Sequence, residues 1–178
     1  MLGGFLATWS QARTTFGDGV PTPGGSFDSS SALRQLESET RSAAPADWTG
    51  GAADAYDVTN TEQARTLARM AELDQRIGQE VDRSAAVVTD GRQRLDAVRE
   101  WVLAAAASVP PNAAGEQMLL PIAAKGCADI EEIITASNAE LAAIAQRIQQ
   151  LGTEYAALGG GGAEKPAGNP PRVSGAQW

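Results

Sequence analysis

A proline-free run of 56 residues, from Ala52 to Ala107, dominates the chain. Large apolar residues recur along it at spacings of three, four and seven: Leu67, Met70, Leu73, Ile77, Val81, Val88, Leu95, Val98 and Val102. Such spacings place the apolar side chains on one stripe of an α-helix, close to a heptad repeat. The helix would be about 85 Å long at 1.5 Å per residue. Propensity alone does not hold so long a helix in water, so we expect a partner helix.

A second amphipathic segment follows Pro110-Pro111. We expect it to begin at Pro121, because proline is well tolerated in the first turn of a helix, and to end near Leu158. Its apolar stripe contains Ile130, Ile133 or Ile134, Ser137, Leu141, Ile144, Ile148, Leu151, Tyr155 and Leu158. Two such stripes facing each other predict an antiparallel helical hairpin, with residues 108–120 as its tip.

The N-terminal quarter of the chain is more broken. Residues 2–16 predict a short helix, and the glycines and prolines of residues 17–25 predict a loop. A helix capped by Asp28 or Ser29 should end near Ala44, before Pro45. We expect this helix to fold back along the start of the long helix. Three or four helices would then pack near Trp48, with a bare two-helix hairpin towards the tip.

These segments define an all-α fold, an elongated antiparallel helical bundle built on a long helical hairpin. We divide it into an N-terminal helix and loop (1–27), a helical bundle (28–158) and a Gly/Pro-rich tail or linker (159–178). The long helix should bend, if anywhere, at Gly78 or Gly91, since each glycine weakens a helix.

Composition excludes several functions. The net charge is -8, which disfavours binding to nucleic acids and to anionic lipid headgroups. Histidine is absent and Cys127 is the one cysteine, so the usual general base and the usual zinc ligands are missing. We expect Cys127 to be half-buried. The carboxylate pairs Asp54–Asp57 and Glu131–Glu132 are interpreted as solvated. We therefore predict no enzyme activity and no cofactor.

No segment has the roughly 20 apolar residues of a membrane span, and the first residues lack the basic start and apolar core of a cleaved signal peptide. We therefore expect no transmembrane segment. If the protein leaves the cell, it must do so by a route that does not require a cleaved signal peptide.

The turn Trp48-Thr49-Gly50 lies between two predicted helices. Glycine permits a backbone conformation that other residues resist, and an indole at the corner can cover the end of a bundle. A three-residue W-x-G pattern is weak evidence alone, because an ordinary helix-turn-helix corner has the same requirements.

The wider context resembles the EspA/EspE family of mycobacterial ESX (type VII) secretion-associated proteins. Residues 48–56 read W-T-G-G-A-A-D-A-Y, similar to the family's W-x-G-x-A-A-x-x-Y signature, which selects Trp48, Gly50, Ala53 and Tyr56. Residues 16–24 read F-G-D-G-V-P-T-P-G, similar to its upstream G-x-G-I-P-x-P-G loop. Residues 70–77 read M-A-E-L-D-Q-R-I, similar to its downstream L-D-x-x-L segment.

This resemblance implies a virulence-associated helical substrate or accessory protein of a type VII system, cytoplasmic before export and then secreted or at the cell surface. Its partners would include the secretion machinery or a chaperone. The tyrosine-x-x-x-acidic export signal of type VII substrates is absent, because Asn60 follows Tyr56 and Gly159 follows Tyr155 at the fourth position. A small helical co-secreted protein would then supply that signal.

The surface for such a partner is predicted on the apolar stripes of the hairpin. The residues are Leu67, Met70, Leu73, Ile77, Val81, Ile144, Ile148, Leu151 and Tyr155. A stripe indicates that something covers it but not what, so a homo-oligomer or closure within the chain stays open. Two other functions also stay open: an N-terminal targeting module of a larger secreted enzyme or toxin, and a cytosolic helical scaffold.

Overall fold

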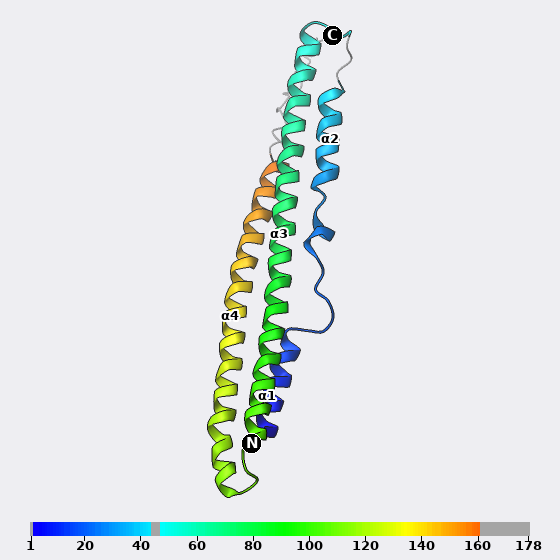
Figure 1. Cartoon of the computed structure of the whole chain (residues 1–178). Coiled ribbons are helices and arrows are strands. Elements are labelled where there is room, and N and C mark those ends of the chain that lie inside the picture. The colour runs from blue at the N-terminus through cyan, green and yellow to red at the C-terminus, as the bar shows by residue number, and fades with distance from the viewer. Residues whose placement is uncertain (1, 44–46, 161–178) are drawn as a thin grey trace, which may run out of the picture.

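The computed structural model describes residues 2–43 and 47–160, and this part of the chain is helical with no β-strand. The elements are α1 (Leu2–Thr15), the 3-10 helix η1 (Gly24–Phe27), α2 (Ser30–Ser42), α3 (Gly51–Ala107) and α4 (Ala113–Gly160). The predicted all-α class and the long antiparallel hairpin are confirmed, because α3 and α4 run alongside each other in opposite directions (Figure 1).

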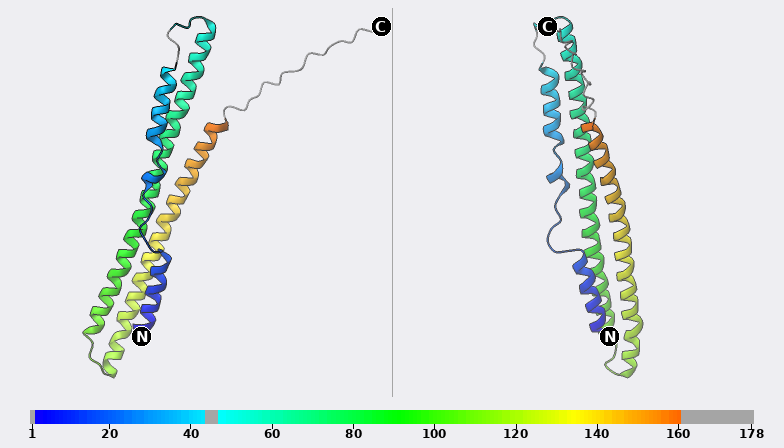
Figure 2. Two further views of the ribbon diagram at one scale, coloured as in Figure 1. Left: turned by 90° about the vertical axis from the view of Figure 1, so that its right-hand side faces the viewer. Right: turned by 180° about the vertical axis from the view of Figure 1, so that it is seen from behind.

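Around this hairpin, α1, η1 and α2 follow one another along α3 (Figures 1 and 2). Helix α1 lies near the hairpin tip and contacts both α3 and α4, whereas α2 contacts α3 at its opposite end. The backbone is extended at Pro23, with φ -70° and ψ 146°. The loop therefore carries the chain onward and does not reverse it.

This path overturns the expected distribution of helices. Three helices pack at the tip, not at the Trp48 end, where the N-terminal half of α3 has α2 beside it (Figure 2). The expectation failed for two reasons. The extended loop places α1 next to the tip and not next to the Trp48 end. Helix α4 also ends near the level of Met70, because Leu158 close to its end lines one groove together with Met70. The first 19 residues of α3, about 28 Å of helix, extend past that point.

The start of α4 also differs from the prediction. The helix begins at Ala113, eight residues before Pro121, so the prediction that Pro121 begins it was wrong. The helix starts here because Asn112 caps it: its Oδ1 accepts the Gly115 N–H at 2.9 Å, and its carbonyl accepts the Glu116 N–H at 3.1 Å. Pro121 is exposed inside the helix, where water can reach the carbonyl that the proline leaves without a donor.

The main apolar core lies between α1, α3 and α4 near the tip. Its buried members are Phe5, Ala12, Leu95, Val102, Ile130 and Ile133. Cys127 is half-buried against this cluster, as predicted. Trp9 also packs there, and its indole N–H donates to the Leu95 carbonyl at 2.9 Å. The core therefore fixes α1 onto the hairpin.

Helix α3 runs without interruption through Gly78 and Gly91. Both glycines face the N-terminal segment: a Cβ on Gly91 would lie 2.3 Å from the Phe16 ring, and one on Gly78 would lie 3.1 Å from the Gly24 carbonyl oxygen. These positions thus accommodate close approach of the N-terminal segment. The predicted tail lies outside the described residues from 161 onward, and α4 reaches Gly160. Within residues 2–43 and 47–160, no helix combines the length and apolar character that crossing a membrane requires.

Candidate functional site

The Trp48 corner is fixed by Gly50, the N-cap residue of α3. Its φ of +105° lies in the left-handed region, which residues with a Cβ adopt only with strain. Its carbonyl accepts the N–H groups of Ala53 and Asp54 at 2.9 and 3.1 Å, which starts the first turn of α3. Glycine at this position is therefore required by the turn itself and not by crowding, since no atom lies near where a Cβ would stand.

Trp48 lies against the first turns of α3. Its ring meets the Tyr56 ring edge-on, with 5.4 Å between centroids and an interplanar angle of 65°. Ala53, one turn before Tyr56, is buried, whereas Trp48 remains 49% exposed. The four residues predicted as the W-x-G motif are thus brought together at one corner, and they present a half-exposed indole.

The nine residues of the predicted partner surface lie on α3 and α4. Leu73, Ile144 and Leu151 are buried within this chain. The other six are half-buried: Leu67, Met70, Ile77, Val81, Ile148 and Tyr155. Closure within the chain thus accounts for part of the surface. That this surface binds a partner stays a prediction, and it now concerns mainly the six half-buried residues.

An open groove of about 590 Å³ lies beyond the end of α4. Its apolar lining comes from Leu36 of α2, Leu67 and Met70 of α3, and Leu158 of α4. Threonines and the side chains of Glu62 and Gln63 complete the walls. Sequence periodicity indicated Leu67 and Met70, but it could not indicate the groove, which exists because α4 stops before α3 does.

The loop that resembles the upstream family motif is held on α3 by polar contacts. Arg92 donates from Nη1 to the Gly19 carbonyl and from Nη2 to the Phe16 carbonyl, the latter at 2.7 Å. Asp82 accepts the Gly24 N–H at 2.6 Å. A Cβ on Gly24 would lie 1.8 Å from the Gly78 carbonyl oxygen, so the loop backbone reaches the backbone of α3 directly.

The downstream motif contributes Asp74, which links three helices. Its Oδ2 accepts the Ser29 N–H at the start of α2 at 3.2 Å, and its Oδ1 accepts the Tyr155 hydroxyl of α4 at 2.9 Å. Burial, together with this hydrogen bond to a carboxylate, raises the pKa of Tyr155 above its usual value. Asp74 lies within the segment that resembles the downstream motif, but its partners Ser29 and Tyr155 are distant in sequence, so the sequence pattern did not indicate this role.

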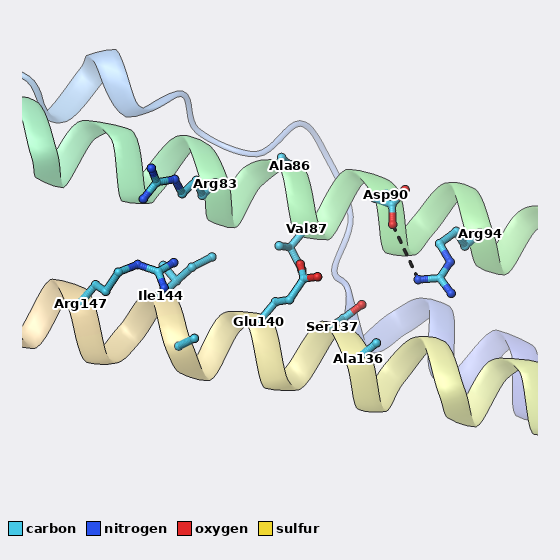
Figure 3. A pocket seen from close by; sticks show the side chains of 11 residues that line it. Arg83, Ala86, Val87, Asp90, Arg94, Ala136, Ser137, Glu140, Ile144 and Arg147 are labelled. Carbon is cyan, nitrogen blue, oxygen red and sulfur yellow. Dashed lines mark ion pairs between the residues drawn. The ribbon is translucent and has the colours of Figure 1, made fainter.

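A buried carboxylate ties the middle of the hairpin. Glu80 is 6% exposed, and it pairs with Arg83 on its own helix and with Arg147 of α4, whose Nε lies 2.9 Å from Oε2. Both arginines border a shallow groove of about 440 Å³ between α3 and α4 (Figure 3). Its walls carry alanines together with the pair Asp90–Arg94, whose charged atoms are 3.9 Å apart (Figure 3). Of these ion pairs, Glu80–Arg147 joins the two helices, whereas Glu80–Arg83 and Asp90–Arg94 lie within α3.

Asp54 and Asp57, interpreted above as solvated, are exposed on α3, and Glu131 and Glu132 are exposed on α4. In the described part of the chain, no three His, Cys, Asp or Glu side chains lie close enough together to hold a metal ion. The arrangement around Trp48 presents apolar and aromatic surface, and aromatic residues are enriched at protein interfaces.

Comparison with known proteins supports the resemblance. The model of the EspA/EspE family matches residues 16–97, which include the Gly/Pro loop, α2, the Trp48 corner and the first 47 residues of α3. Among curated proteins and among solved structures, none matches the chain. The match contains all three motifs that resemble the family, and it ends before the hairpin tip. Residues 16–97 thus match the EspA/EspE family model, in agreement with the resemblance of the three motifs, and this match points to a type VII secretion-related protein.

Proposed function

We propose that the chain is a substrate or accessory protein of a type VII (ESX) secretion system, and that it acts by binding a helical protein that supplies the export signal. The observation that carries this proposal is the Trp48 corner. A left-handed Gly50 holds a half-exposed indole against Tyr56 at the end of the molecule, within the segment that matches the family. With 49% of its surface exposed, this indole is accessible to another protein, and aromatic side chains of this kind are enriched among the residues that dominate binding.

The partner would lie in line with α4, along the first 19 residues of α3. There it would fill the groove formed by Leu36, Leu67, Met70 and Leu158 and extend the bundle towards Trp48. On this part of α3 the acidic residues Asp54, Asp57 and Glu62 outnumber the basic residues Arg65 and Arg69. We therefore expect a partner helix with an apolar stripe bordered by basic residues.

An export assay in a host with a type VII system tests the corner. Replacing Trp48 with alanine, or Gly50 with alanine, should remove the protein from the culture filtrate while the cells retain a helical protein. The matched controls are Phe27→Ala, an aromatic 52% exposed on η1, and Gly25→Ala, a glycine with free space around it. Unchanged export of both corner variants would favour the cytosolic scaffold.

A second experiment tests the partner. The tagged protein is purified from the same host, and its solution mass is measured by light scattering. A small helical chain with a tyrosine-x-x-x-acidic tail should co-purify, and the double substitution L67Q/M70Q should release it. Val20→Gln, at a position 95% exposed on the loop, is the control. A lone monomer would contradict the paired mechanism, and a dimer of this chain would replace it with self-association.

A further inference from the structure

An open furrow runs between α3 and α4 on the face of the hairpin turned away from the N-terminal segment, which passes behind the two helices in Figure 3. The groove of about 440 Å³ described above shares Arg83 and Arg147 with a second groove of about 280 Å³. The second shares Arg76 with a third of about 460 Å³. Together they reach from Arg94 to Arg69, about 38 Å along α3. Every lining residue belongs to α3 or α4, so no described residue of α1, η1 or α2 covers this furrow.

The floor of the furrow is low at its centre. Ala86 and Ala143 are exposed there, beside the half-buried Val87 and the buried Ile144. Alanine side chains are short, so another pair of helices can approach to the separation of packed helices, about 8–10 Å. Two further helices on this face would complete a four-helix bundle.

One end of the central groove has a surplus of positive charge. Glu80 is the carboxylate that pairs with both Arg83 and Arg147, so two guanidinium groups meet one carboxylate. The side chains of Arg83 and Arg147 are 57% and 43% exposed. They can therefore bind a further carboxylate from outside the chain while both keep Glu80.

The other part of the groove has a surplus of negative charge. Asp90 and Glu140 line it, together with the guanidinium of Arg94, which lies 3.9 Å from the Asp90 carboxylate (Figure 3). The Asp90 side chain is 67% exposed, and Glu140 is also exposed. Two carboxylates here meet one guanidinium group, which reverses the ratio found around Glu80.

The charges are spaced in the same way on both helices. Asp90 follows Arg83 by seven residues on α3, and Arg147 follows Glu140 by seven residues on α4. Because the helices are antiparallel, both arginines lie at one end of the groove and both acids lie towards the other (Figure 3). A two-fold axis across the furrow between these ends would set the acids of a second copy over these arginines, and its arginines over these acids. An interface between two-fold related copies must be self-complementary in this way.

We propose that two copies of this chain pack furrow to furrow as an antiparallel dimer, with the Ala86 level on the two-fold axis. The net charge of -8 on each copy opposes association at long range, but salt screens it beyond about 8 Å, so the pairs in contact decide. This proposal is independent of the export function, because the Leu67 groove lies beyond the end of α4, away from the axis. A dimer that carries a helical chain at each Leu67 groove is compatible with both proposals.

The first test measures the mass of the purified full chain over a concentration series by analytical ultracentrifugation. We expect a dimer, and D90R/E140R should raise its dissociation constant by about tenfold or more, because arginines would then face arginines. The matched control is D57R/E131R, which changes the net charge equally at two exposed residues that do not line the furrow. It should associate like the wild type, and circular dichroism checks that each variant remains helical.

The second test measures the register with cysteines in a Cys127→Ala background. Ala86→Cys should form a disulfide between copies, because the axis brings the two positions together. Gln79 and Arg94 lie on opposite sides of the axis at similar distances along α3. Q79C and R94C should therefore cross-link when they are mixed, and neither should cross-link alone.

Several results would overturn the proposal. These are a wild type that stays monomeric throughout the series, an equal loss of association in both double variants, and a Q79C protein that cross-links with itself, which requires parallel copies. A dimer that L67Q/M70Q dissociates and D90R/E140R does not would place the contact at the Leu67 groove. A monomer that binds a different protein through Asp90 and Glu140 would show that the furrow is made for another chain. None of these results depends on export.

Discussion

Four ionisable residues of α3 each bind a part of the chain that is distant in sequence. Asp74 binds the start of α2 and the Tyr155 hydroxyl, Asp82 binds the Gly24 N–H, and Arg92 binds loop carbonyls. Glu80 reaches Arg147 across the hairpin. On a helical projection these side chains resemble the solvated face of an exposed helix. Their partners are distant in sequence, so periodicity could not distinguish them from the charges that do face water.

The Glu80 contact should contribute more to stability than an exposed pair on the same two helices. Arg147→Ala leaves a carboxylate in a 6% exposed residue with Arg83 alone, and we expect a loss of about 2 kcal/mol in the free energy of unfolding. Arg76→Ala removes an exposed pair with Glu154 at 3.1 Å and should cost less than about 1 kcal/mol. Urea unfolding measures both, and equal losses would contradict the special role of Glu80.

Gly50 should be more sensitive to substitution than its exposure suggests. Gly50→Ala must place a Cβ at φ +105°, which costs about 1–2 kcal/mol. Gly25→Ala, at another glycine with free space around it, lacks a left-handed backbone and should change stability little. Thermal unfolding of the two variants gives the comparison. A Gly50→Ala protein as stable as wild type would show that the corner relaxes to another conformation.

Tyr155 should make stability fall at high pH. Its pKa is raised in the folded state, so folding favours the protonated hydroxyl. The stabilisation is complete below the unfolded pKa of about 10 and is lost as the pH rises through the higher folded value. In Tyr155→Phe this part of the decline should disappear, whereas Tyr56→Phe should retain it. The measurement is the urea midpoint between pH 9 and pH 11.5.

At the level of elements, sequence periodicity located the hairpin well. Helix α3 begins and ends within one residue of the predicted bounds, because Gly50 and Pro110 are strong terminators next to a long apolar stripe. The start of α4 was missed because Pro121 resembled a helix start, whereas Asn112 provides the cap. The position of α1 was missed because the direction in which the loop leaves α2 depends on backbone angles that composition does not fix.

Two glycines of α4 should respond to alanine with opposite signs. A Cβ on Gly126 would lie 2.6 Å from a Val102 methyl group and 2.7 Å from the Phe5 ring, so Gly126→Ala should destabilise the α1 contact by about 1–3 kcal/mol. Gly152 has free space around it, and Gly152→Ala should stabilise the helix by up to about 1 kcal/mol. Denaturant unfolding measures both. A stabilised Gly126→Ala would indicate that α1 packs less closely than described.

At the scale of the whole molecule, packing is uneven along the long axis. The main core joins three helices near the tip, and beyond the end of α4 the start of α3 has α2 beside it. The corner motif was evident from residues 48–56. The neighbouring groove was not, because it depends on where two distant helices end relative to each other.

Amide hydrogen exchange should follow this gradient. Residues 51–66 of α3 should exchange faster than residues 91–105, because local opening of the first region exposes fewer buried contacts. Binding of a helical partner at the Trp48 end should slow exchange in residues 51–66 and leave the tip unchanged. Uniform exchange along α3 would mean that the whole bundle opens as one cooperative unit.

The early end of α4 also gives the rod a mechanical polarity. A force applied at the Trp48 corner first separates two helices joined along one side. It reaches the end of α4 after about 28 Å of α3 has been freed, and the three-helix core, which begins at Leu95, after about 66 Å. A force applied at the tip meets the core at once. Pulling on the Trp48 corner should therefore unfold the protein in several small steps, whereas pulling on the tip must disrupt the three-helix core first.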